Sequence, residues 1–235
     1  MNNRTFFFLF FNIYSVLCLA QQNNYSQKKE YGYNGPIKKV STYTVSIIGA
    51  TIPADTLNYD SKSVMTFNKK GDILTNDRLY VLREQQFSYK ATYSGSGKNI
   101  SYKETAKVTG KAPKETHFLY DWDNDFSYKI VAKDTINSIE TTIALNKDYS
   151  IEKATVSGKD YHSEEHLTYT KNNKNQIEEI ITTSSITQNN ETTTEKHQQV
   201  SKSFDIYDNP TVIYYYEKKG NRIPSMIFFR YYEYY

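Results

Sequence analysis

The chain has 235 residues, a formal net charge of +3 and one cysteine. Lys and Arg are interleaved with Asp and Glu without a block of like charges, so neither nucleic acid nor an anionic membrane is an evident partner. The sequence holds 23 Tyr and 12 Phe against 9 Gly and 5 Pro. A composition so rich in aromatic residues favours β-strands.

The N-terminus has the pattern of a cleavable secretory signal. Arg4 precedes an apolar run, residues 6–19, and the small residue Ala20 stands at its end. The run is shorter than the roughly 20 apolar residues that cross a bilayer, which argues against a membrane anchor. We therefore expect cleavage after Ala20, no transmembrane span in the mature chain, and a secreted, periplasmic or envelope-associated protein.

The single cysteine, Cys18, lies inside this signal segment. Cleavage after Ala20 removes it, so the mature chain has no disulfide and depends on burial and strand pairing for stability. In an alternative interpretation the chain is a lipoprotein and Cys18 is acylated. Leu17 stands before it, however, where lipoprotein signals carry a small residue.

After the signal, residues 21–35 are polar and predict a flexible lead-in. Residues 36–235 have the pattern of a single all-β domain, beginning with strict alternation over Val40–Ile47. A turn of helix is expected only near residues 76–82. Similar runs predict strands at 63–67, 86–93, 100–108, 126–132, 139–145, 166–169, 177–186, 212–216 and 223–235.

Polar turn signals separate these runs, as at 70–72, 123–125 and 208–210. Short strands joined by tight turns predict an antiparallel meander of many short hairpins. We expect the meander to form an elongated twisted sheet or a shallow sandwich, with Lys and Thr protecting its edges.

Several of the turns look related to one another. Each has an aromatic residue, then an acid or amide, then spacers and a turn-former; the segments are 67–73, 120–126, 204–210 and 216–222, with a worn copy at 169–173. This form resembles the Tyr-Asp-x-x-Gly core of YD-repeat (Rhs-type) proteins. The resemblance implies exported hairpin arrays of unknown function, although the copies have no fixed period. Large YD-repeat proteins look like shells around a toxin domain, and this chain is too short for that role.

His162, Glu165 and His166 match the inverted zinc-protease pattern His-x-x-Glu-His. In that chemistry two histidines on one helical face bind zinc and the glutamate polarises water. The surrounding residues predict strand and turn instead of helix. A zinc-dependent hydrolase is therefore an alternative, and a charged hairpin is the preferred interpretation.

Asp121, Asp123 and Asp125 alternate as oxygen ligands do in a calcium loop. An EF-hand needs Gly at the sixth position and Glu at the twelfth, where this chain has Phe126 and Ala132. The pattern predicts a polar hairpin turn, and we expect no metal or other cofactor.

Tyrosine runs near the C-terminus suggest an aromatic platform that could stack on sugar rings. Consecutive tyrosines in a strand point to opposite faces, so part of each run faces solvent. The candidate binding residues are Tyr214, Tyr216, Tyr232, Tyr234 and Trp122.

The aromatic last strand is also typical of outer-membrane β-barrels. Barrels in lipid need a continuous apolar band, which runs such as 101–105 and 182–185 lack. No nucleotide-binding loop or serine-hydrolase elbow is present. We therefore expect a non-catalytic exported envelope or surface protein that binds a glycan or protein partner or serves structurally. Its alternatives are the zinc hydrolase, a carboxylate glycosidase and the outer-membrane barrel.

Overall fold

The computed structural model describes residues 25–49, 51–82, 85–133, 139–189, 191–218 and 220–235. The expected signal segment, its cleavage site and Cys18 lie outside the described residues. Within them the chain is all-β and antiparallel, as predicted, apart from one short helix. No helix among these residues is long and apolar enough to cross a bilayer.

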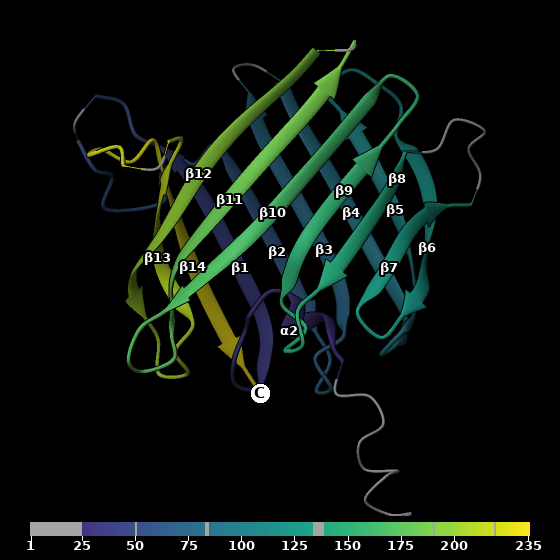
Figure 1. The fold of residues 1–235 in the computed structure, drawn as a ribbon, viewed down its shortest axis with the longest axis horizontal. Helices are drawn as coiled ribbons and strands as arrows, with labels where there is room; N and C mark the ends of the chain where they lie inside the picture. Colours follow the sequence, from purple (N-terminus) through teal and green to yellow (C-terminus); the bar gives the residue numbers. More distant parts are fainter. Residues whose placement is uncertain (1–24, 50, 83–84, 134–138, 190, 219) are drawn as a thin grey trace, which may run out of the picture.

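In the described part of the chain, fourteen strands follow one another around a closed barrel, each antiparallel to its neighbours (Figure 1). They are β1 (Ile37–Ser46), β2 (Ser61–Phe67), β3 (Ile73–Leu82), β4 (Gln85–Ser96), β5 (Asn99–Val108), β6 (Lys114–Asn124), β7 (Ser127–Ala132), β8 (Glu140–Leu145), β9 (Ile151–Ser157), β10 (Tyr161–Lys171), β11 (Ile177–Gln188), β12 (Glu191–Phe204), β13 (Pro210–Tyr216) and β14 (Met226–Tyr234).

The barrel closes where the first strand pairs with the last. Ile37 lies opposite Tyr234 and Ser46 opposite Met226, with a bulge near Lys39. The expected twisted sheet or shallow sandwich is therefore corrected to a barrel, and its described strands leave no free edge for Lys and Thr to protect. The reason is that β1 and β14 complete each other's hydrogen bonds, a pairing between the two ends of the chain that local alternation does not reveal.

The two faces of the wall differ in chemistry. Val40 lies beside Met65 on one side and Tyr232 on the other, and these side chains point into the lumen. The alternate positions face outward and include Lys103 of β5, next to Glu115 of β6. Most aromatic and apolar residues thus gather inside the barrel, and many charged residues and hydroxyls lie outside. Val45 of β1 and its partner Ile227 of β14 are exceptions, because they are buried on the outer side of the wall.

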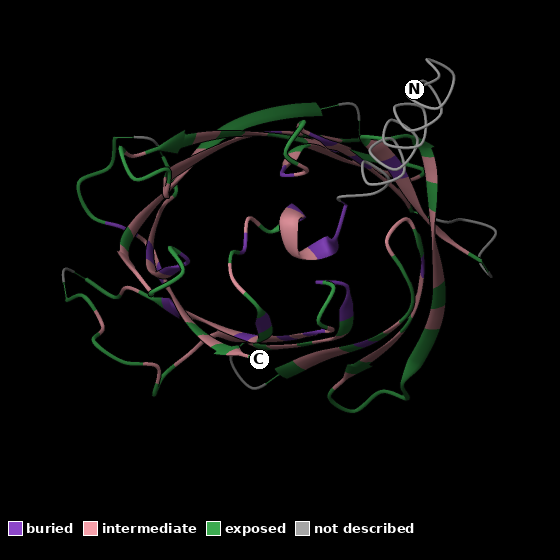
Figure 2. Cartoon of the chain, turned by 90° about the horizontal axis from the view of Figure 1, so that it is seen from below, coloured by how far each residue is buried: buried purple, intermediate pink, exposed green. Residues whose placement is uncertain are grey.

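The segment expected to be a flexible lead-in, within its described part 25–35, enters one end of the barrel. It contains a single helical turn, α2 (Gln27–Glu30), whose Gln27 and Glu30 side chains are buried. Viewed along the barrel axis, this turn lies in the lumen, inside the ring of strands (Figure 2). We call residues 25–35 the plug and the end of the barrel that it enters the plug end. Residues 76–82, expected to hold a helical turn, belong to strand β3.

Candidate ligand cavity at the plug end

The plug is fixed against one side of the barrel by polar contacts. The Gln27 side-chain oxygen accepts a hydrogen bond from the Ile73 backbone N–H at 2.9 Å, and its amide donates to the Tyr120 hydroxyl at 3.2 Å. The Lys28 N–H donates to the Gly71 carbonyl at 2.9 Å. Gln27 has 1 % of its surface exposed, so its amide is satisfied by β3 and β6 and not by water.

Glu30 anchors the plug to β7. Its carboxylate accepts hydrogen bonds from the Tyr25 hydroxyl at 2.5 Å and from the Tyr128 hydroxyl at 3.1 Å. The described residues form no ion pair with it. Burial in this aromatic surrounding raises the pKa of Glu30 from 4.5 to about 7, although both tyrosine hydrogen bonds favour the charged form.

An aromatic cluster covers the same side of the plug. The Tyr25 ring meets Trp122 edge-on at 4.7 Å, and Trp122 lies 4.6 Å from Tyr128. The Lys98 ammonium stands 4.8 Å from the centre of the Trp122 ring. These contacts hold the helical turn of the plug against the β3–β7 side of the lumen, and Asn34 at the end of the plug contacts Asn209 of the β12–β13 turn.

Four turns at the plug end share one backbone geometry. In each, the N–H of the first residue donates to the carbonyl of the fifth, the N–H of the fourth donates to the carbonyl of the first, and the fourth has a positive φ. The turns are 68–72, 146–150, 172–176 and 205–209. In three of them the side-chain oxygen of the first residue, Asn68, Asn172 or Asp205, also accepts from the third and fifth N–H groups.

The turns at 68–72 and 205–209 lie within segments that resemble YD repeats, and the turn at 172–176 begins in the worn copy at 169–173. The turn at 146–150 was not singled out in the sequence. The other two segments fold differently. The one at 120–126 forms a tight connection in which Asn124 pairs with Ser127, and the one at 216–222 leads into the β13–β14 connection at the opposite end. Kinship with YD repeats stays a prediction.

The plug and three of the turns line an open cavity of about 1710 Å³. Its walls are the plug residues 32–35, the turns at 146–150, 172–176 and 205–209, and the plug-end part of β10. Aromatic and charged side chains share the lining. They include Tyr149, Tyr169, Tyr207, Asp148, Lys147, Lys171 and Lys174.

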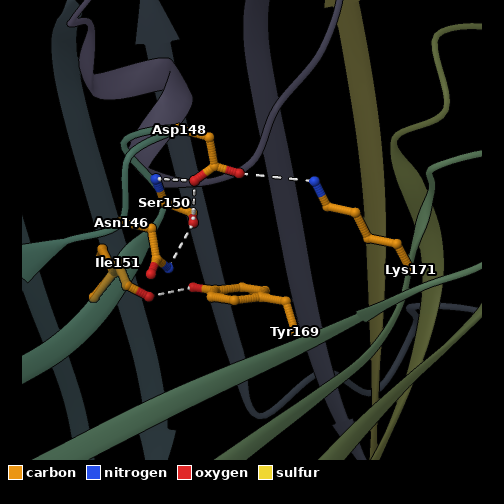
Figure 3. Close-up of polar contacts among 6 residues, drawn as sticks. All are labelled: Asn146, Asp148, Ser150, Ile151, Tyr169 and Lys171. Atoms are coloured by element: carbon orange, nitrogen blue, oxygen red, sulfur yellow. Dashed lines mark hydrogen bonds and ion pairs between the residues drawn. The ribbon is translucent and has the colours of Figure 1, made fainter.

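A hydrogen-bonded network fixes one wall of the cavity (Figure 3). The Ser150 hydroxyl donates to the Asp148 carboxylate at 2.7 Å and accepts from the Asn146 amide at 3.0 Å. The Lys171 ammonium lies 3.7 Å from the other Asp148 oxygen. The hydrogen bond from Ser150, helped by Lys171, keeps the pKa of Asp148 below its ordinary value, so Asp148 is a carboxylate beside the Lys171 ammonium. Tyr169 donates to the Ile151 carbonyl at 2.7 Å, which fixes its ring.

Tyr149 occupies a strained position in this wall. Its φ of +68° corresponds to the position that Gly71, Asn175 and Asp208 hold in the other turns. A bulky residue in this left-handed region costs roughly 1–3 kcal/mol and persists only where its surroundings hold it. The Tyr149 ring stacks on Phe126 at 5.4 Å, and the Lys29 ammonium lies 5.5 Å from its centre.

The five residues of the predicted aromatic platform do not lie together. Tyr214 and Tyr216 lie on the outward face of β13, since their neighbour Tyr215 lines a lumen pocket with residues of β11 and β12. Tyr232 and Tyr234 pack in the lumen beside the plug, and Trp122 belongs to the cluster around Tyr25. A binding role for these residues stays a prediction. The cavity aromatics Tyr149, Tyr169 and Tyr207 were not candidates; the signal available for them was their place in or beside the related turns.

The zinc-protease alternative is corrected by the geometry of β10. His162, Glu165 and His166 lie in a strand and not in a helix. The two histidines point outward about 13 Å apart along the strand, and Glu165 points to the opposite face, into the lumen. In the described part of the chain no three His, Cys, Asp or Glu side chains form a group that could hold a metal ion.

The three aspartates of the calcium-like pattern are also separated. Asp121 and Asp123 extend along the outward face of β6, and Asp125 lies in the following turn. The Asp125 carboxylate pairs with the Lys98 ammonium at 2.5 Å. The segment is therefore a polar hairpin turn, as the preferred interpretation predicted.

No protein-family model matches the chain, and no curated protein matches it either. Among solved structures it is similar to a porin-like protein from Bacteroides uniformis, with 8 % sequence identity and a TM-score of 0.34. The match covers 86 % of this chain and 98 % of the other.

Proposed function

We propose that the protein is a non-catalytic exported barrel whose outer wall faces water and which binds a glycan in the cavity beside the plug. The observation that carries this proposal is the division of the wall, with charge pairs outside and the aromatic clusters and the cavity inside. The outward charge pairs bear on the medium around the barrel, and the cavity bears on its ligand.

Ion pairs between neighbouring strands extend over the outer face. Lys103 lies 2.6 Å from Glu115, Lys129 lies 3.3 Å from Glu140, and Lys153 lies 2.6 Å from Glu164. These pairs bridge β5–β6, β7–β8 and β9–β10. A lysine facing lipid at the middle of a bilayer costs roughly 2–4 kcal/mol, whereas the same lysine in water costs almost nothing. A wall with this many outward lysines is stable in water.

The cavity supports a polyhydroxylated ligand. Tyr149, Tyr169 and Tyr207 offer ring surfaces on which the C–H face of a sugar can pack. Asp148, Lys147 and Lys174 stand among them and can pair with hydroxyl groups. A large cavity with a few placed polar groups is typical of small-ligand sites, and the hydrogen-bonded turns hold this one in shape.

A glycan array with purified residues 21–235 tests the ligand. We expect binding to a subset of glycans, and loss of that binding in Tyr207→Ala, because Tyr207 lines the cavity and 37 % of its surface is exposed. The matched control is Tyr214→Ala, which removes a tyrosine from the outer wall and should leave binding unchanged. Loss of binding in the Tyr214 variant alone would place the ligand on the outer wall, and absence of any glycan binding would refute the proposed ligand.

A second candidate is an outer-membrane β-barrel. It is favoured by the closed antiparallel architecture and by outward aromatic residues on two adjacent strands, Tyr214 of β13 and Phe229 and Tyr231 of β14. Such a barrel requires detergent for extraction and changes its gel migration on heating. Migration that does not depend on heating, together with extraction in plain buffer, would exclude it.

A further inference from the structure

A second pocket lies in the lumen on the wall that β10, β11, β12 and β13 form side by side (Figure 1). We call it the inner pocket. It is open, has a volume of about 260 Å³ and shares no lining residue with the plug-end cavity. Thr182 of the inner pocket pairs with Leu167 of the plug-end cavity, so the inner pocket continues the lumen surface toward the opposite end of the barrel.

Two carboxylates flank the inner pocket. Glu165 of β10 and Glu195 of β12 both lie directly opposite Ser184 of β11. Two strand spacings, about 10 Å, separate their Cα atoms, a distance across which two glutamate side chains can converge on one group. In the described part of the chain neither forms an ion pair with a lysine or arginine. The buried Ser184 hydroxyl lies 3.5 Å from Glu165.

His197 adds a hydrogen-bond acceptor to the same pocket. Its Nδ1 lies 2.9 Å from the Glu217 carbonyl, and because a carbonyl only accepts, Nδ1 carries the hydrogen. The Nε2 of the neutral ring is then an acceptor, and it lies 3.5 Å from the Glu195 carboxylate, which is an acceptor too. A donor between these two atoms must be either a proton on His197 or an N–H group of a ligand.

The surroundings of the inner pocket are electrostatically negative. Burial raises the pKa of the Tyr215 hydroxyl, and the charges of Glu217, Glu195 and Glu165 raise it further. Tyr215 lines the pocket beside His197, with 5.6 Å between the two ring centres. No lysine or arginine of the described residues lines the pocket.

The basic side chains of the lumen belong to other parts of it. On the described strands, those that point inward are Arg78 of β3, Lys114 of β6, Lys171 of β10 and Arg230 of β14. Arg78 is paired with Glu104, and Arg230 lies 5.8 Å from the centre of the Tyr33 ring of the plug. Lys114 is six strands away from β12. Lys171 is six residues from Glu165, roughly 20 Å along the strand, and pairs with Asp148.

We propose that the inner pocket binds a ligand through a primary ammonium group held between Glu165 and Glu195. Such a group has three N–H donors, which match the two carboxylates and the Nε2 of His197. The hydroxyls of Thr182 and Ser184 stand beside it for other polar groups of the ligand. Linear diamines and amino sugars both carry this ammonium. The proposal depends neither on what the plug-end cavity binds nor on what surrounds the barrel.

Ligand-observed NMR on purified residues 21–235 tests the proposal with two probes, 1,4-diaminobutane and glucosamine. The neutral analogues 1,4-butanediol and N-acetylglucosamine have the same skeletons without the ammonium. We expect at least one probe to bind roughly tenfold or more tightly than its analogue, and added salt to weaken the binding. Binding of diaminobutane alone would support a linear amine as ligand, and binding of glucosamine alone an amino sugar. Absence of binding by both probes, or equal binding of the neutral analogues, would overturn the proposal.

Variants of the two carboxylates locate the ammonium. Glu165→Gln and Glu195→Gln should each weaken binding by roughly 10-fold to 100-fold, because each removes a charged acceptor and keeps the size of the side chain. Glu164→Gln is the matched control, since it makes the same change at the neighbouring, outward position of β10 and should leave binding unchanged.

Two results with these variants would overturn the proposal. One is an equal loss of binding in Glu164→Gln. The other is a loss in Asp148→Asn with none in Glu195→Gln, which would place the ammonium in the plug-end cavity. Circular dichroism of each variant confirms that the barrel is folded.

Discussion

The inner and outer faces of the barrel wall have the same alternating backbone and opposite chemistry. Inside, Phe67 and Tyr128 are almost wholly buried, with 1 % and 2 % of their surfaces exposed. Phe67 belongs to the cluster that contains Tyr33 of the plug, and Tyr128 to the cluster that contains Tyr25 of the plug. Outside, Lys129 and Glu140 form an exposed ion pair between β7 and β8. The comparison teaches that the inner face supplies the core of this protein, whereas a barrel in lipid places its continuous apolar band outside.

The largest expected difference between the faces is in the removal of an aromatic ring. Phe67→Ala leaves a cavity in the lumen cluster and should lower the free energy of unfolding by about 3–5 kcal/mol. Tyr231→Ala on the outer face, where the ring is 53 % exposed, should lower it by about 1 kcal/mol or less. Urea unfolding of both variants measures the difference, and equal losses would contradict the assignment of the core to the inner face.

The buried carboxyl of the plug makes stability depend on pH. The pKa of Glu30 is about 7 in the folded protein and 4.5 ordinarily, so the folded state holds a proton that the unfolded chain releases. The stabilisation from this proton is full below about pH 4.5 and is lost as the pH rises through about 7, with a total on the order of 3 kcal/mol.

In Glu30→Gln this pH dependence should disappear, so the variant should gain stability relative to the unchanged protein between pH 5 and pH 8. Urea midpoints across this range measure the effect. Parallel pH curves for the two proteins would show that Glu30 is not buried in the lumen.

Removal of the Gln27 amide should change the free energy of unfolding by less than the substitutions at Phe67 and Glu30. Gln27→Leu leaves the buried Ile73 N–H without its acceptor and should cost roughly 1–3 kcal/mol. Hydrogen exchange should speed up at Ile73 and leave the outer pairs of β7 and β8 unchanged. Unchanged exchange at Ile73 would mean that the plug does not hold β3.

The smallest change in the free energy of unfolding is expected for a substitution on the outer face. Lys129→Leu breaks an exposed ion pair and should change the free energy of unfolding in water by less than about 1 kcal/mol. The same change would stabilise a barrel embedded in lipid by roughly 2–4 kcal/mol. A large stabilisation in detergent micelles would therefore favour the outer-membrane candidate.

Much of the strand pattern could be read from the sequence because alternation is clear where one face is apolar. The pattern was missed in β6, whose aromatic residues were interpreted as part of a turn over 120–126, and in β9. It was also missed where both faces are polar. In β3, Asn76 and Arg78 face the lumen and Asp77 faces outward, so alternation vanished and a helical turn was expected there. Strand β12 was missed for the same reason, since its lumen face carries Glu195, His197 and Gln199.

Closure and the plug could not be predicted from local patterns. The pairing of β1 with β14 joins residues nearly 200 positions apart, such as Ile37 and Tyr234. Apart from its tyrosines, the plug contains polar residues and glycines that are usual in disordered segments. Gln27 and Glu30 are buried with hydrogen-bond partners that Tyr120 and Tyr128 supply. The sequence pattern identified the Asn and Asp residues that begin three of the four related turns. It could not show that these turns lie at one end of a barrel and line a cavity there, because that arrangement follows from closure.

The central claim, that the outer wall faces water, is tested most directly by size-exclusion chromatography with light scattering on residues 21–235 in detergent-free buffer. The account predicts a monodisperse, folded species that needs no detergent at any step. A protein that aggregates in buffer and becomes monodisperse only in detergent would contradict it.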